Sequence, residues 1–173
     1  MSNYATRLTV DLTNLKANYA LFQKLVGDHC QVAGVVKANG YGTGADAAAY
    51  TLEEAGCTTF FVATLDEAIQ LRKVTQKPIA VLGGLYKDAE AEYTAHGLLP
   101  VLNSAEEILR GTYQGPSIWH VDTGMNRLGL RHETIPDLLD EPGVTPPAIF
   151  MSHFACADEK DHPLNAKDRK SVV

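Results

Sequence analysis

Six short apolar runs recur along the chain, and each is followed by a segment with helical character. Several of these runs are rich in β-branched residues, which is typical of strands buried on both faces of a sheet. The predicted strands end near residues 37, 63, 82, 102, 122 and 152. One strand and one helix in every repeat form the building unit of an α/β fold with a parallel sheet.

Six consecutive units with no obvious sheet edge favour a (β/α)8 barrel of the TIM type over an open sheet. A doubly wound sheet remains an alternative from the pattern alone, although no GxGxxG motif follows the first strand. If the fold is a barrel, the chain supplies only its N-terminal six βα units. We therefore expect a truncated barrel that folds poorly, because its strand edges stay unpaired.

The first helical pattern spans residues 12–26, and Asp11 or Thr13 is the expected N-cap. Its apolar side chains recur at spacings of three and four, which predicts one buried face. These side chains are Leu15, Tyr19, Phe22 and Val26. A second signal is the segment 104–107, Ser-Ala-Glu-Glu, which resembles a capping box at the start of a later helix.

Composition excludes several classes of function. The chain has 15 basic and 21 acidic residues and a net charge of −6, so binding to nucleic acid or to an anionic membrane surface is not expected. The three widely spaced cysteines argue against a disulfide framework or a zinc site, and they fit a reducing compartment. No apolar run is long enough for a signal peptide core or a membrane span. We expect a cytoplasmic protein.

In a barrel, catalytic groups lie at the C-terminal ends of the strands. Lys37 directly follows the apolar run that ends the first predicted strand. Apolar surroundings lower the pKa of an amine, and a neutral amine forms an imine with an aldehyde. Taken alone, however, this lysine is better explained as one whose charged end reaches solvent or pairs with a carboxylate.

Two more strand ends carry polar groups. His120, Asp122 and Arg127 lie at or just beyond the fifth strand, where the arginine could clamp a carboxylate or a phenolic oxygen. A surface loop with an exposed ion pair explains them equally well. His153 ends the sixth strand, and a lone histidine of this kind is more often structural than catalytic.

Together these segments resemble alanine racemase. Residues 37–44, Lys-Ala-Asn-Gly-Tyr-Gly-Thr-Gly, are similar to the pyridoxal phosphate attachment signature of that family. Residues 121–129 resemble the loop after its fifth strand, and residues 152–158 resemble the end of its sixth strand. The opening segment 9–18 is similar to its first helix. The resemblance covers about residues 4–167, and the segments occur in the order of the family.

The resemblance implies a role for each matching residue. Lys37 holds pyridoxal phosphate covalently and acts as the base on one face of the substrate. Tyr41 lies near the cofactor phosphate, and Leu82 lines the cofactor pocket. Arg127 reaches the phenolic oxygen of the cofactor and helps to place the substrate carboxylate. His153 packs near the pyridine ring and orients an arginine further along the chain.

Position 120 departs from the family. Many members have a lysine there that becomes carbamylated and holds the arginine equivalent to Arg127. His120 cannot carry a carbamate in that way, and when neutral it makes only a single hydrogen bond in this role. We expect an anion such as chloride, or a nearby side chain, to support Arg127 instead.

The resemblance also implies an organisation and a partner. Residues 1–167 would be a partial pyridoxal phosphate barrel, and the C-terminal β domain of the family would be missing. Residues 168–173 match the translation of a common sequencing adapter, so we expect them to be a non-native tail. A natural early stop or a frameshift is the alternative. The complete protein would be a homodimer that interconverts L- and D-alanine for peptidoglycan, with a tyrosine of the partner's C-terminal domain as the second base. The fragment itself would be inactive.

Three alternatives remain. One is a non-catalytic barrel that binds pyridoxal phosphate for cofactor homeostasis, although its lysine motif differs from the one here. Another is a racemase that acts on other or more varied amino acids, such as serine or lysine. The third is a structural fragment without function.

Overall fold

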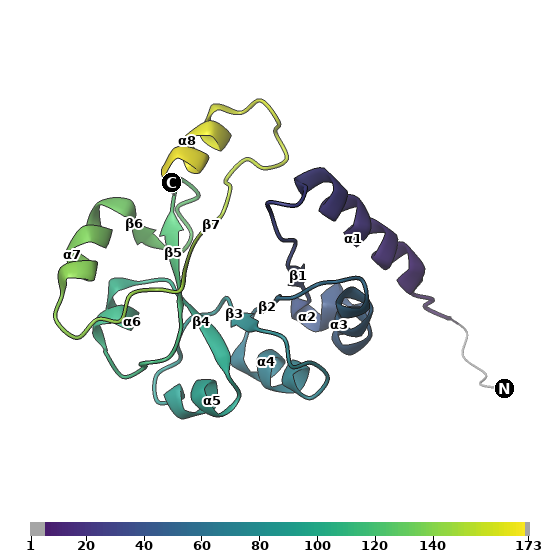
Figure 1. Ribbon diagram of the computed structural model, residues 1–173, viewed down its shortest axis with the longest axis horizontal. Helices are drawn as coiled ribbons and strands as arrows, with labels where there is room; N and C mark the ends of the chain where they lie inside the picture. The colour runs from purple at the N-terminus through teal and green to yellow at the C-terminus, as the bar shows by residue number, and fades with distance from the viewer. Residues whose placement is uncertain (1–5, 172–173) are drawn as a thin grey trace.

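The structure is a computed structural model, and it describes residues 6–171. Figure 1 shows strands arranged in an arc, with helices around the outside of the arc. The strands are β1 (Gly34–Val35), β2 (Phe60–Val62), β3 (Ile79–Val81), β4 (Leu98–Leu102), β5 (Ile118–Asp122), β6 (Leu130–Arg131) and β7 (Ile149–Ser152). The helical elements are α1 (Leu12–Val26), α2 (Lys37–Tyr41), α3 (Ala45–Glu54), α4 (Leu65–Arg72), α5 (Glu90–Ala95), α6 (Ala105–Leu109), α7 (Ile135–Asp140) and α8 (Pro163–Ser171). Of these, α2 is a short turn with left-handed dihedral angles after Lys37.

Sequential strand order identifies the fold as part of a barrel. The strands β1 to β5 pair in chain order, and every pair is parallel. β7 then pairs with β5 in the register Ile118↔Ile149, and the two-residue β6 pairs only with the end of β5 in the described residues. A doubly wound sheet would reverse its strand order at a switch point. The predicted TIM-type barrel, represented by its N-terminal six βα units, is therefore confirmed.

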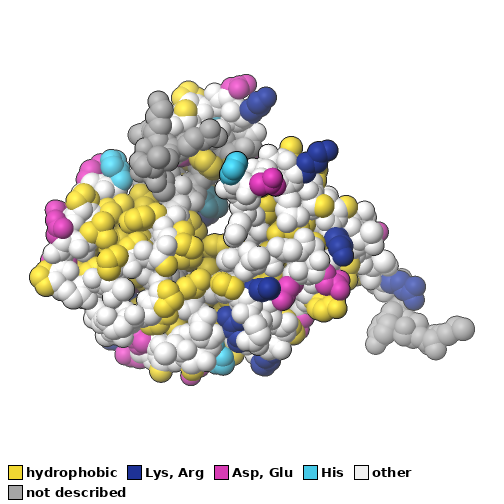
Figure 2. Space-filling view, in the orientation of Figure 1, with side chains coloured by type: hydrophobic (Ala, Val, Ile, Leu, Met, Phe, Trp, Pro, Cys, Tyr) yellow, Lys and Arg dark blue, Asp and Glu magenta, His cyan; other side chains and the backbone are white. Residues whose placement is uncertain are grey.

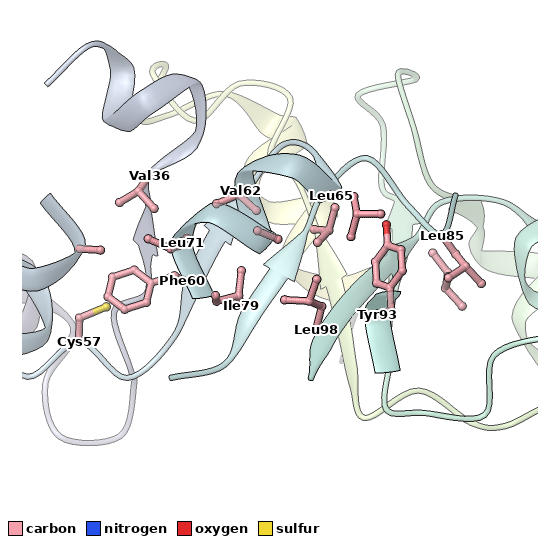
Figure 3. Close-up of a cluster of buried hydrophobic side chains, with 14 of the residues drawn as sticks. Val36, Cys57, Phe60, Val62, Leu65, Leu71, Ile79, Leu85, Tyr93 and Leu98 are labelled. Atoms are coloured by element: carbon pink, nitrogen blue, oxygen red, sulfur yellow. The ribbon is translucent and has the colours of Figure 1, made fainter. Parts of the chain in front are cut away.

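The pleat of the strands divides the core into two clusters. The larger cluster lies between the strands and the helices, and Figure 3 shows part of it, including Phe60, Ile79 and Leu98. The smaller cluster contains residues from strands and strand ends only, such as Ala80, Val101 and Ile118. Because neighbouring residues of a strand point to opposite faces, the smaller cluster marks the inner face of the barrel.

Helix α1 begins as predicted, but fewer of its apolar side chains are buried than the sequence predicts. Asp11 is its N-cap, and its carboxylate accepts a hydrogen bond from the backbone N–H of Thr13 at 2.9 Å. Tyr19 is buried and donates its hydroxyl to the carbonyl of Val32. The prediction of burial is wrong for Phe22, which is 57% exposed, and for Val26, because α1 packs mainly against α3 at the end of the arc.

The strand predictions are confirmed for β4 and are close for the others. The first predicted strand is shortened to Gly34–Val35, because residues 38–41 turn into the left-handed region directly after Lys37. Short elements between Leu130 and Asp140, namely β6, a 3-10 helix and α7, have no counterpart in the prediction.

The two edges of the arc carry exposed apolar side chains. Among the described residues, β1 pairs only with β2, and β7 pairs only with β5. Ile149, Phe150 and Phe154 are each at least 40% exposed at the β7 edge, and Val35 is exposed on β1. Figure 2 shows hydrophobic side chains gathered over the β7 and α7 side of the molecule. Parallel barrel strands normally have both edges paired.

The expected boundary between residues 167 and 168 lies inside α8. Asp168 is buried, and one of its carboxylate oxygens has no hydrogen-bond partner among the described residues. The other oxygen accepts a long hydrogen bond of 3.4 Å from the N–H of Ala155. Residues 172–173 of the expected tail lie outside the described residues, so its non-native origin stays a prediction.

Candidate active site at the strand ends

Several of the residues selected from the sequence lie on the inner face of the barrel or at the strand ends beside it. Leu82 packs in the inner cluster just after β3, and its N–H donates to Val62 as a continuation of the strand. His120 lies on β5 opposite Met151 of β7, and Met151 belongs to the same inner cluster. Lys37 follows the end of β1 by two residues and His153 directly follows β7, so both stand at the carboxyl ends of the parallel strands.

Lys37 stands at the start of a strained turn. Ala38, Asn39 and Tyr41 have φ values of 51°, 53° and 55°, which costs about 1–2 kcal/mol for each residue with a side chain. Strain of this kind persists only where the surroundings hold it. Here the N–H of Gly40 donates to Val36 at 2.8 Å, and the side chain of Asn39 accepts from the N–H of Ala45 at 3.0 Å.

His120 is buried and held by an asparagine that the sequence analysis did not select. Its Nδ1 lies 2.8 Å from the side-chain oxygen of Asn103. The amide nitrogen of Asn103 donates to the carbonyls of Leu82 and Val101 at 3.0 and 2.8 Å, so its oxygen is left as an acceptor. His120 must therefore carry its proton on Nδ1, which leaves Nε2 as an acceptor.

Four of the selected residues, Lys37, His120, Arg127 and His153, are linked by pKa effects. Burial lowers the pKa of His153, and the positive charges of Arg127 and Lys37 lower that pKa further. Burial also lowers the pKa of His120, with additional effects from His153 and Arg127, while Asp122 opposes the shift. Lys37 and Arg127 thus lie within electrostatic range of His153, and the lowered pKa values of His120 and His153 favour their neutral forms. Figure 2 shows a central hollow with histidine side chains at its rim.

Asp122 shapes the loop that carries Arg127. Its carboxylate accepts hydrogen bonds of 3.0 Å from the N–H groups of Gly124 and Asn126. Burial acts to raise the pKa of Asp122, but the backbone donors outweigh burial and the pKa is lowered. Arg127 itself makes no hydrogen bond or ion pair with any other residue that the structure describes. No supporting side chain is thus seen, and support by an anion stays a prediction.

Tyr41 is exposed and is not hydrogen-bonded to the other selected residues that the structure describes. Its side chain is 64% exposed, and no hydrogen bond within residues 6–171 joins it to Lys37, Arg127 or His153. Asn103 is the residue that the analysis missed. Its polar side chain at a strand end was a usable signal, because that end of a barrel strand is where functional groups lie.

The depressed pKa of His120 predicts a pH dependence of stability. A folded-state pKa below the unfolded value of about 6.5 means that the unfolded chain binds the proton more tightly. The contribution of neutral His120 to folding stability is therefore fully present above about pH 6.5 and is lost as the pH falls below that value. The fall in unfolding free energy from about pH 7 to pH 5 should be shallower in His120→Gln than in wild type. Urea titrations at several pH values measure it, and exposed His29→Gln is the control; equal slopes in all three proteins would contradict this assignment.

Fold and site together define the class of this domain: a parallel βα barrel with a strand-end lysine beside an arginine and two imidazoles. The family is then given by comparison. Residues 10–172 match the family model described as alanine racemase, N-terminal domain, and the chain belongs to this family. Within residues 6–171, no helix is long and apolar enough to cross a membrane.

Curated relatives and solved structures agree with this assignment. The chain is 40% identical to an alanine racemase of Rhodospirillum rubrum, with 94% of this chain and 46% of that protein covered. It is 42% identical to a catabolic alanine racemase of Agrobacterium fabrum, with 92% and 44% covered. The crystal structure of the Bartonella henselae alanine racemase with covalently bound pyridoxal phosphate superimposes with a TM-score of 0.83 at 34% identity, over 94% of this chain and 48% of that one. The chain spans about half the length of the curated relatives it matches.

Proposed function

We propose that the protein to which this chain belongs interconverts L-alanine and D-alanine with pyridoxal phosphate held on Lys37. The observation that carries the proposal is the position of Lys37 at the carboxyl end of the first barrel strand, where Lys37 and Arg127 both lower the pKa of His153. The relatives at about 40% identity are alanine racemases, and one related structure holds the cofactor covalently.

The residues present fit this cofactor. An aldehyde needs a primary amine, which Lys37 offers, and the anionic groups of the cofactor need nearby positive charge, which Arg127 provides. The apolar side chain of Leu82 lies on the inner face of the barrel. Tyr41 would reach the cofactor phosphate only with its exposed hydroxyl turned toward the site.

The chemistry is proton transfer at the Cα of the amino acid. When bound, the pyridine ring of the cofactor delocalises negative charge and so makes the Cα proton acidic. Lys37 accepts or returns that proton at Nζ on one face of the substrate. Arg127 places the substrate carboxylate, and burial keeps His120 neutral, so that its Nε2 accepts rather than donates a hydrogen bond.

Racemisation also needs a proton donor on the opposite face. We infer that this group is a tyrosine of a partner subunit, supplied by a C-terminal part that lies outside the present chain. The proposal therefore includes a homodimer as the working form. It also places the reaction in the bacterial cytoplasm, where D-alanine would serve the synthesis of peptidoglycan.

A trapping experiment and an activity assay test the proposal together. The full-length protein is mixed with pyridoxal phosphate and reduced with borohydride, and mass spectrometry locates the modified lysine. Conversion of L-alanine to D-alanine is measured in the same preparation. Modification of Lys37 with racemisation of alanine supports the proposal. Modification without racemisation of any amino acid points to a non-catalytic cofactor-binding barrel, and preference for serine or lysine changes the substrate.

A further inference from the structure

Glu67 connects the lysine turn to the neighbouring strand. One carboxylate oxygen accepts a hydrogen bond of 2.6 Å from the N–H of Ala38, the residue directly after Lys37. The other oxygen accepts 2.7 Å and 3.3 Å hydrogen bonds from the N–H groups of Ala63 and Thr64. Ala63 and Thr64 follow β2, and Thr64 is the N-cap of α4. A single carboxylate therefore ties the loop after β1 to the end of β2.

We propose that Glu67 is a positioning residue that holds the turn after Lys37 and thereby fixes the direction of the lysine side chain. This inference rests on the proposed role of Lys37. The turn needs such a hold, because Ala38 and Asn39 both adopt left-handed φ values that side chains disfavour. A hydrogen bond to an ionised acceptor is among the strongest available to a backbone N–H.

A helix cap alone does not account for these contacts. In a capping box, the glutamate at the third helical position reaches back to the N–H of the N-cap residue. The corresponding contact to Thr64, at 3.3 Å, is the longest that the Glu67 carboxylate accepts, whereas the contact to Ala38 spans 29 residues of sequence. The carboxylate thus lies closest to the two strand ends rather than to the cap.

The chain repeats this arrangement at a place far from the lysine. Glu107 caps α6 in the same way, with its carboxylate accepting from the N–H groups of Asn103 and Ser104 at 2.6 and 3.0 Å. Its other oxygen accepts from the N–H of Leu85, in the loop after β3, at 2.9 Å. Glu107 therefore offers a control with the same kind of contacts at another pair of strand ends. It reaches the site only through Asn103, the partner of His120, and makes no hydrogen bond to residues 37–41.

The experiment compares Glu67→Ala, Glu67→Gln and Glu107→Ala in the full-length protein. The first readout is amide hydrogen exchange, which does not depend on the cofactor. Exchange at Ala38 should accelerate about tenfold or more in Glu67→Ala, and exchange at Leu85 should do so in Glu107→Ala. Glu67→Gln should be intermediate, because the amide keeps one acceptor oxygen and replaces the other with an NH2 group that cannot accept from a backbone N–H.

The second readout is the rate at which pyridoxal phosphate and borohydride modify Lys37. It should fall about tenfold in Glu67→Ala and stay near wild type in Glu107→Ala, even where both variants lose similar thermal stability. Equal exchange at Ala38 in wild type and Glu67→Ala, or equal slowing of Lys37 modification in both alanine variants, would overturn the inference. Wild type that is never modified at Lys37 instead overturns the proposed function, while exchange at Ala38 still decides whether Glu67 holds the turn.

Discussion

Replacement of Lys37 by alanine is expected to abolish covalent attachment of pyridoxal phosphate and to lower kcat for alanine racemisation by at least about 10³-fold. The lysine would supply both the amine that holds the cofactor and the base on one face of the substrate. Lys37 stands at the end of β1 and acts on the pKa of His153, so we expect no other lysine to replace it. Absorbance of the bound cofactor and a coupled assay for D-alanine measure the two effects.

Lys73→Ala is the matched control for this variant. Lys73 lies exposed at the end of α4, where its ammonium group donates to the side chain of Gln70. It should keep the cofactor and the wild-type rate. Lys37→Ala protein that still racemises alanine at more than about one hundredth of the wild-type rate would show that the reacting lysine lies elsewhere.

The barrel could be predicted because its strands are short apolar runs at regular spacing. The strand end predicted near residue 102 is confirmed, because β4 ends at Leu102 and Ser104 with Glu107 caps the next helix. The elements β6 and α7 could not be predicted, because they are too short to show a periodic pattern. They contain two and six residues, too few to show a period, and they are held by contacts with β5 and the neighbouring helices.

Burial is harder to predict than secondary structure. Helical spacing correctly places Phe22 on the apolar side of α1, but spacing does not say which element covers that side. In the structure, α1 packs against α3 at one end of the arc, which buries Tyr19 and leaves Phe22 exposed. The same limit applies to Ile149 and Phe150, whose apolar character predicts a buried strand although β7 lies at an edge.

The candidate site shows a similar division. Lys37, His120 and His153 could be selected because each stands at a strand end, and the structure brings them together with Arg127. Asn103 was missed although its place at a strand end was a usable signal. Glu67 was missed because its role depends on a contact with Ala38, 29 positions away. Long-range contacts of this kind leave no local pattern in a single sequence.

Gly129→Ala should be the most damaging glycine substitution in the loop that carries Arg127. Gly129 has a φ of 116°, and an added Cβ would lie 2.7 Å from the backbone nitrogen of Asp122 and 3.1 Å from the carbonyl oxygen of His120. Both atoms belong to β5, so the loop and not a flexible side chain must move. We expect a loss of about 2–4 kcal/mol of unfolding free energy from combined strain and overpacking.

Gly143→Ala separates the two causes, because Gly143 also has a positive φ, 85°, but an added Cβ meets no atom within 4 Å. Backbone strain alone should cost that variant about 1–2 kcal/mol. Denaturant titrations of both variants measure the difference, and equal losses would show that the close approach of Gly129 to β5 has no energetic weight. Because Gly129 lies two residues after Arg127, only its variant should also lower kcat/KM for alanine. A loss of kcat/KM confined to Gly129→Ala would show that the close packing of this glycine on β5 positions the loop that carries Arg127.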